Sequence, residues 1–108
     1  MRSLFLAIAL VFASGFLIAA DQDRSPAQTV EAKAAMLAAS CSGCHVQAPT
    51  KEGFPSIYGR PAAEIRDLLL DFRSGEREGT VMNRLAKGYT DAEIELLADF
   101  FAMQGSTQ

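Results

Sequence analysis

The sequence predicts a small all-α domain, and three observations lead to that fold class. Two segments, 65–72 and 94–101, place apolar residues at positions i, i+3, i+4 and i+7, which is the period of one helix face. An alanine-rich stretch at 27–39 has a high helix propensity. No segment alternates apolar and polar residues over the length of a strand. We therefore expect three main helices joined by loops and short helical turns.

The N-terminal segment is not expected to belong to this domain. Met1-Arg2-Ser3 precedes an apolar run from Leu4 to Ile18, and Ala19-Ala20 follows before the first acidic residue. This order is typical of a secretory signal peptide. A retained membrane anchor is the alternative, but the run is shorter than the roughly 20 residues of a spanning helix. We predict a signal peptide at 1–20, a single domain at 21–108, export to the periplasm, and no stable membrane insertion after cleavage.

The first helix is expected to begin at Ser25-Pro26-Ala27-Gln28, where serine caps, proline takes the first helical position and Gln28 completes a capping box. It should run to about Ser40. The stretch from Cys41 to Pro61 is divided by glycines and prolines and is predicted to be a loop. A loop of that length in a small domain is usually functional.

The second helix is expected to start at Pro61 and to end at Ser74-Gly75. A short helical segment, Thr80–Ala86, should follow. Thr90 and Glu93 form a capping box for the last helix, which should end near Gln104-Gly105.

Composition narrows the possible functions. The net charge is −3, from 10 basic and 13 acidic residues, and the two signs are interspersed along the chain. A nucleic-acid-binding domain would normally be basic. The chain is short and has no tryptophan, so a bound cofactor would enlarge a small core.

The motif Cys41-Ser42-Gly43-Cys44-His45 has the spacing of a c-type haem attachment site. Two thiols can reach two vinyl groups of one porphyrin, and an imidazole follows directly to bind the iron. We predict one covalent haem c, attached at Cys41 and Cys44 and ligated by His45. The carbonyl group of Pro55 is our candidate to hold the second ring nitrogen of His45 and so orient the ring.

Three other interpretations of this motif are less favoured. A zinc site needs four ligands, and the chain has only two cysteines and one histidine. A redox-active dithiol usually lies at a strand-to-helix turn, and no strand is expected. Two cysteines in an exported protein usually form a structural disulfide, but these two stand only three positions apart and a histidine follows directly.

Met82 is predicted to be the second axial ligand of the iron. Methionine is the usual partner of histidine in cytochromes c. Met36 is too close to Cys41 to reach the opposite haem face, and Met103 is expected to pack at the end of the last helix. Met82 lies beyond the loop and a full helix, so the chain has room to pass around the haem. The alternative is that Met82 only fills the core, which would leave a five-coordinate iron able to bind gases.

The chain resembles the class I cytochromes c, and within them the haem subunits of flavocytochrome c sulfide dehydrogenases and related periplasmic cytochromes. The matching segments are Cys41–His45, Pro55–Pro61, Asp71–Gly75 and Thr80–Asp91. The resemblance implies a cytochrome c-like fold wrapped around one haem, with His45 and Met82 as axial ligands and Pro55 orienting His45. It also implies that the first and last helices cross, with Ala34, Ala35 and Ala38 against Phe100 or Phe101. Such relatives often carry two haem domains, whereas this chain has one attachment motif.

These features predict an electron carrier rather than an enzyme, because iron with two protein axial ligands has no open position for bond chemistry. Its partners would be a redox protein that donates electrons and another that accepts them. The alternative function is that of an electron-accepting haem subunit, in which catalysis belongs to a separate flavoprotein chain.

Overall fold

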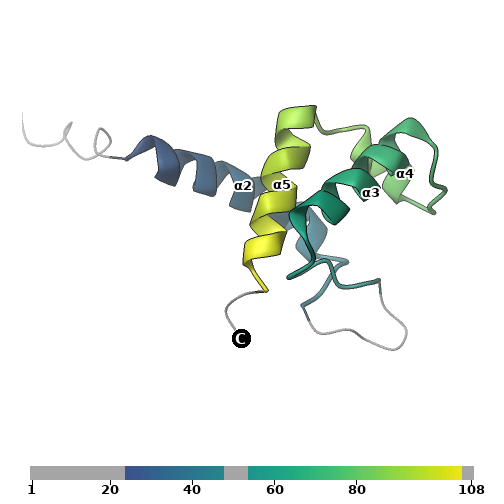
Figure 1. The fold of residues 1–108 in the computed structure, drawn as a ribbon, viewed down its shortest axis with the longest axis horizontal. Coiled ribbons are helices and arrows are strands. Elements are labelled where there is room, and N and C mark those ends of the chain that lie inside the picture. The colour runs from purple at the N-terminus through teal and green to yellow at the C-terminus, as the bar shows by residue number, and fades with distance from the viewer. Residues whose placement is uncertain (1–23, 48–53, 106–108) are drawn as a thin grey trace, which may run out of the picture.

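The computed structural model describes residues 24–47 and 54–105. Within these ranges every regular element is a helix, in the order α2 (Pro26–Ser42), α3 (Ala62–Ser74), α4 (Met82–Ala86) and α5 (Asp91–Met103). Helix α5 contacts both α2 and α3, and α4 packs on α3 (Figure 1). The predicted all-α class is confirmed. The predicted signal peptide at 1–20 lies outside the described residues.

Helix α2 begins as predicted but ends later. The Ser25 Oγ accepts the Gln28 backbone N–H at 3.3 Å, and the Gln28 side chain accepts the Ser25 N–H at 3.0 Å. The helix continues through Ser42, so the prediction of a loop starting at Cys41 was wrong. The Ser42 hydroxyl donates to the Ala38 carbonyl at 3.1 Å, a local bond that lets a serine remain in the last helical turn.

The other helix boundaries differ from the predictions by one or two residues. Pro61 precedes α3 and its carbonyl accepts the Ile65 N–H at 3.2 Å, while Gly75 follows the helix with φ of 89°. Helix α4 starts at Met82 rather than Thr80. The capping box of α5 is confirmed, with the Thr90 Oγ1 accepting the Glu93 N–H at 3.3 Å.

The core lies where α2, α3 and α5 meet. Its buried members are Ala38, Ile65, Leu97, Ala98 and Phe101. The ring of Phe101 also meets the Tyr58 ring edge-on at 5.1 Å, which adds a favourable aromatic contact.

The crossing of α2 and α5 uses two of the three predicted alanines. Ala34 and Ala38 are buried, with 6% and 2% of their surface exposed, whereas Ala35 is exposed. The prediction for Ala35 was wrong. Residues four apart share a helix face, but Ala35 is turned about 100° from Ala34 around the helix axis.

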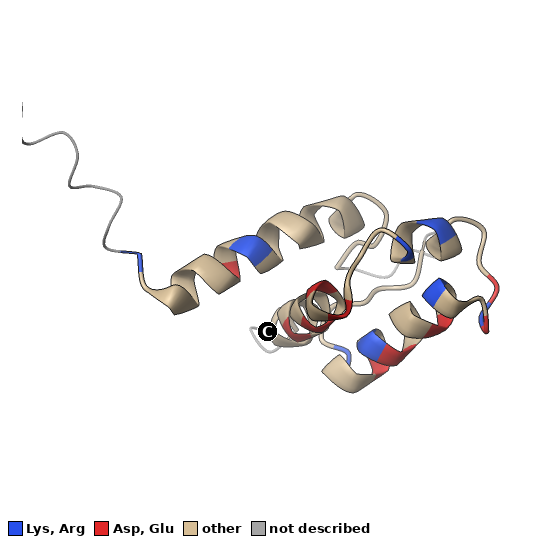
Figure 2. Cartoon of the chain, turned by 90° about the horizontal axis from the view of Figure 1, so that it is seen from above, with Lys and Arg blue, Asp and Glu red and all other residues tan. Residues whose placement is uncertain are grey.

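Charged residues of both signs are interspersed along α3 (Figure 2). Arg60 pairs with Glu64 at 2.8 Å, and Arg66 lies 3.7 Å from Glu95 of α5. These pairs are exposed, so each contributes little to stability. Among residues 24–47 and 54–105, no helix has the length and apolar character needed to cross a membrane.

Candidate functional site

A cavity of about 390 Å³ is lined by residues from all four helices and from the segments between them. The residues selected from the sequence all contribute to its lining: Cys41, Cys44, His45, Pro55 and Met82. The rest of the lining is mostly apolar and includes Phe54, Ile57, Ile65, Leu68, Leu69, Phe72, Val81, Leu85, Leu97 and Phe101. An apolar cavity with a few polar groups is typical of a cofactor or ligand site.

His45 is held by the turn that follows α2. The Cys41 carbonyl accepts backbone N–H groups from both Cys44 and His45, at 3.1 and 2.9 Å, which closes a tight turn around Gly43. His45 is 8% exposed, and its Nδ1 lies 2.6 Å from the Pro55 carbonyl oxygen. Because a carbonyl only accepts hydrogen bonds, Nδ1 donates to it, and in a neutral imidazole Nε2 then has the lone pair that can bind a metal ion.

The two cysteines flank this turn. Cys41 is half-buried in the last turn of α2, Cys44 is exposed, and they do not form a disulfide with each other. Burial raises the pKa of the Cys41 thiol, although hydrogen bonds with Ser40 and Tyr89 act in the opposite direction. Redox-active dithiols rely on a lowered thiol pKa, so this environment does not favour the dithiol interpretation. Among the described residues, no three or more His, Cys, Asp or Glu side chains cluster as metal ligands.

Met82 is the first residue of α4 and is half-buried. Of the methionines in the described part of the chain, it is the one that lines the cavity. Met36 is 79% exposed and Met103 is 63% exposed. Met103 is the last residue of α5, as expected, and it does not line the cavity.

The chain is similar in sequence to curated proteins that are cytochromes or electron acceptors. The chain is 44% identical over 72 residues to the cytochrome subunit of sulfide dehydrogenase from Chlorobaculum tepidum, a match that covers 66% of each chain. It is 35% identical over 80 residues to a thiosulfate dehydrogenase electron acceptor from Stutzerimonas stutzeri, which covers 74% of this chain and 37% of that protein. The chain belongs to the cytochrome c family. No protein-family model matches it.

The cytochrome spans about two thirds of the length of the first relative and less of the others. A thiosulfate dehydrogenase electron acceptor from Thiomonas intermedia is 32% identical over 68 residues, which are 31% of its length. The predicted family and the predicted cytochrome c-like fold are both confirmed.

The cavity has the chemistry that a haem requires. Its lining includes one imidazole, one thioether and two thiols. The remaining, mostly apolar lining would exclude water from a porphyrin. Arg60 and Arg77 are the charged residues in the lining, and their charge is opposite to that of the haem propionates. The residues present therefore fit a haem c.

Several residues that line the cavity were not selected from the sequence. The Tyr89 hydroxyl lies 2.8 Å from the Ser40 Oγ, and the two residues border the cavity beside Cys41. The Arg77 guanidinium lies 5.5 Å from the centre of the Phe72 ring. Tyr89 lies in the matching segment Thr80–Asp91, but its contact with Ser40 depends on how the chain packs against the end of α2. No motif in the sequence selects Arg77, although the ring that it contacts is close to it in the chain.

Proposed function

We propose that this cytochrome is a monohaem electron carrier of the periplasm, in which His45 and Met82 are the axial ligands of the haem iron. When bound, the haem supplies an iron that gains or loses one electron. The observation that carries the proposal is the grouping of a carbonyl-oriented His45 and Met82 in one apolar cavity. The names of its relatives, a cytochrome subunit and two electron acceptors, also support electron transfer.

Each site residue has a distinct task in this proposal. Cys41 and Cys44 anchor the cofactor through thioether bonds, so it cannot leave when its oxidation state changes. Pro55 holds Nδ1 of His45 and thereby aims Nε2 at the iron. Met82 would be the second residue to hold the iron, and a methionine ligand would raise its reduction potential. With two protein ligands on the iron, the chain would transfer electrons without bond chemistry and so act as a carrier rather than an enzyme.

Export completes the proposal. Haem attachment to this motif takes place outside the cytoplasm, so residues 1–20 would act as a signal peptide. Residues 21–108 would then form the single mature domain. The mass of the protein purified from the periplasm tests both points. It should correspond to the chain from Asp21 plus one haem, and an intact N-terminus or a haem-free chain would contradict it.

Replacing Met82 tests the iron ligation. The Met82→Ala protein should keep its covalent haem, lose the methionine-to-iron charge-transfer band in the far-red spectrum of the oxidised form, and bind carbon monoxide when reduced. Met36→Ala is the matched control, since Met36 is 79% exposed and lies outside the cavity lining. Retention of the band in Met82→Ala would refute the assignment.

A second candidate function is that of an electron-accepting haem subunit in a sulfide dehydrogenase-type complex. It is favoured by the 44% identity to a cytochrome subunit of sulfide dehydrogenase. Purification from the native periplasm decides between the two. A stable complex with a flavin-containing chain, in which sulfide reduces the haem, supports the subunit role, whereas a free monomer supports the independent carrier.

A further inference from the structure

The short helix that carries Met82 has little to stabilise it by itself. Helix α4 contains five residues, and no side chain caps its first turn. So short a helix is not stable alone, because its nucleation costs more than its few hydrogen bonds return. The position of Met82 must therefore depend on contacts that tie α4 to the rest of the domain.

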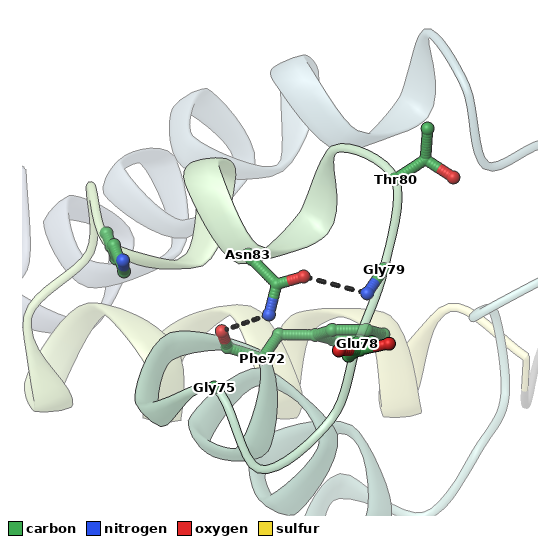
Figure 3. A pocket seen from close by; sticks show the side chains of 7 residues that line it. Phe72, Gly75, Glu78, Gly79, Thr80 and Asn83 are labelled. Atoms are coloured by element: carbon green, nitrogen blue, oxygen red, sulfur yellow. Dashed lines mark hydrogen bonds between the residues drawn. The ribbon is translucent and has the colours of Figure 1, made fainter.

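The side chain of Asn83 supplies three such contacts. Its Oδ1 accepts the Gly79 N–H at 2.7 Å, and its Nδ2 donates to the carbonyl oxygens of Phe72 at 2.8 Å and Arg77 at 2.7 Å. Figure 3 shows the amide of Asn83 between the end of α3 and the passing connector. The amide has one correct orientation here, because its donors face two carbonyls and its acceptor faces an N–H. Asn83 thus joins α4 to α3 and to two points of the connector 75–81.

The connector passes close to the ring of Phe72, which borders the cavity. A Cβ on Gly79 would lie 2.8 Å from Cε1 of Phe72, so the backbone at Gly79 runs directly against that ring. Phe72 also lines the cavity together with Met82. The three hydrogen bonds of Asn83 therefore link the backbone beside Met82 to one wall of the cavity.

We infer that Asn83 is a positioning residue, which holds Met82 in the cavity by anchoring the first turn of α4 to α3 and the connector. The inference rests on the proposed ligation of the haem iron by Met82. Movement of the first turn of α4 would carry Met82 away from the iron, and the hydrogen bonds of Asn83 resist that movement. Asn83 thereby keeps the cavity closed to added ligands.

Competition with imidazole measures this closure. An external ligand binds the iron only in the fraction of molecules where Met82 has left, so its apparent affinity scales with that fraction. Loss of three partly solvated hydrogen bonds in Asn83→Ala should raise the apparent imidazole affinity on the order of tenfold. Asn83→Asp should have at least as large an effect, because its carboxylate would face two carbonyl oxygens. Glu78→Ala is the control, because Glu78 lies in the same connector and makes no hydrogen bond or ion pair with the described part of the chain.

Two further readouts separate this inference from the proposed function, namely hydrogen exchange at Gly79 and imidazole binding by Met82→Ala. Exchange at the Gly79 amide should speed up in Asn83→Ala, because that amide loses its acceptor. Faster Gly79 exchange with unchanged imidazole affinity would overturn the positioning role, as would an equal effect of Glu78→Ala. If Met82→Ala and the parent protein bind imidazole equally well, the ligation by Met82 itself fails instead.

Discussion

Replacing Gly59 with alanine should destabilise the cytochrome through two separate effects. Gly59 has φ of 73°, in the left-handed region that glycine occupies without strain, and its N–H donates to the Phe101 carbonyl at 2.9 Å. A Cβ at this position would also lie 2.9 Å from Cα of Gly105. The turn at Gly59 and the end of α5 therefore meet backbone to backbone, with no space for a side chain.

Gly75 offers a control that isolates the first effect. It has φ of 89°, and a Cβ there would meet nothing within 4 Å. Gly75→Ala should cost about 1–2 kcal/mol, the conformational penalty alone. Gly59→Ala carries the same penalty plus about 1–3 kcal/mol for forcing apart packed backbone. Gly105→Ala carries the steric cost, because its Cβ would collide with Cα of Gly59. It carries no conformational penalty, because the φ of Gly105 is not positive.

Denaturant unfolding of the haem-loaded proteins, followed by far-ultraviolet circular dichroism, measures the three free energies. The expected order of destabilisation places Gly59→Ala above Gly75→Ala by about 1–3 kcal/mol. In a domain of this size, that difference corresponds to at least about 4 °C in Tm. Equal effects of Gly59→Ala and Gly75→Ala would refute the close approach of Gly59 to Gly105.

Two further predictions concern α2 and α5. Ala38→Val should destabilise the protein by about 1–3 kcal/mol more than Ala35→Val, because both lose the same helix propensity but only Ala38 is buried against α5; equal unfolding midpoints would contradict this crossing. The pKa of the Glu93 carboxyl is lowered because it accepts hydrogen bonds from the backbone N–H and hydroxyl of Thr90. Its ionised form therefore stabilises the fold above the ordinary glutamate pKa, and this contribution is lost as the pH falls through the lowered value in the folded state. Glu93→Gln keeps the cap but does not titrate, so its stability deficit at neutral pH should disappear under acid in urea titrations; a deficit that does not change with pH would contradict the shift.

Much of the local structure was predictable because it depends on short-range chemistry. The capping boxes at Ser25 and Thr90 and the apolar stripe of α5 follow from residues within one or two helical turns. The haem motif is also local, since all of its groups lie between Cys41 and His45. Helix ends were less predictable, and α2 includes Cys41 and Ser42 because local hydrogen bonds outweigh the turn signal of Gly43.

The error at Ala35 shows where a sequence pattern stops being sufficient. Ala34, Ala35 and Ala38 have the same side chain, so composition cannot tell which of them faces α5. The rotation of α2 about its own axis decides it, and that rotation is set by how Phe101 and Leu97 fit against Ala38.

The sequence by itself determined the helical class, the helix caps and the residue types suited to hold a haem, because these depend on neighbours along the chain. Only the tertiary structure decided which side chains surround one cavity and how the Met82 segment is held. Tyr89 takes its place through a contact with Ser40 at the end of α2, and Asn83 through a hydrogen bond to Phe72 of α3. Such contacts arise from packing, in which shape and hydrogen bonding between helices select one arrangement among many that the same local pattern allows.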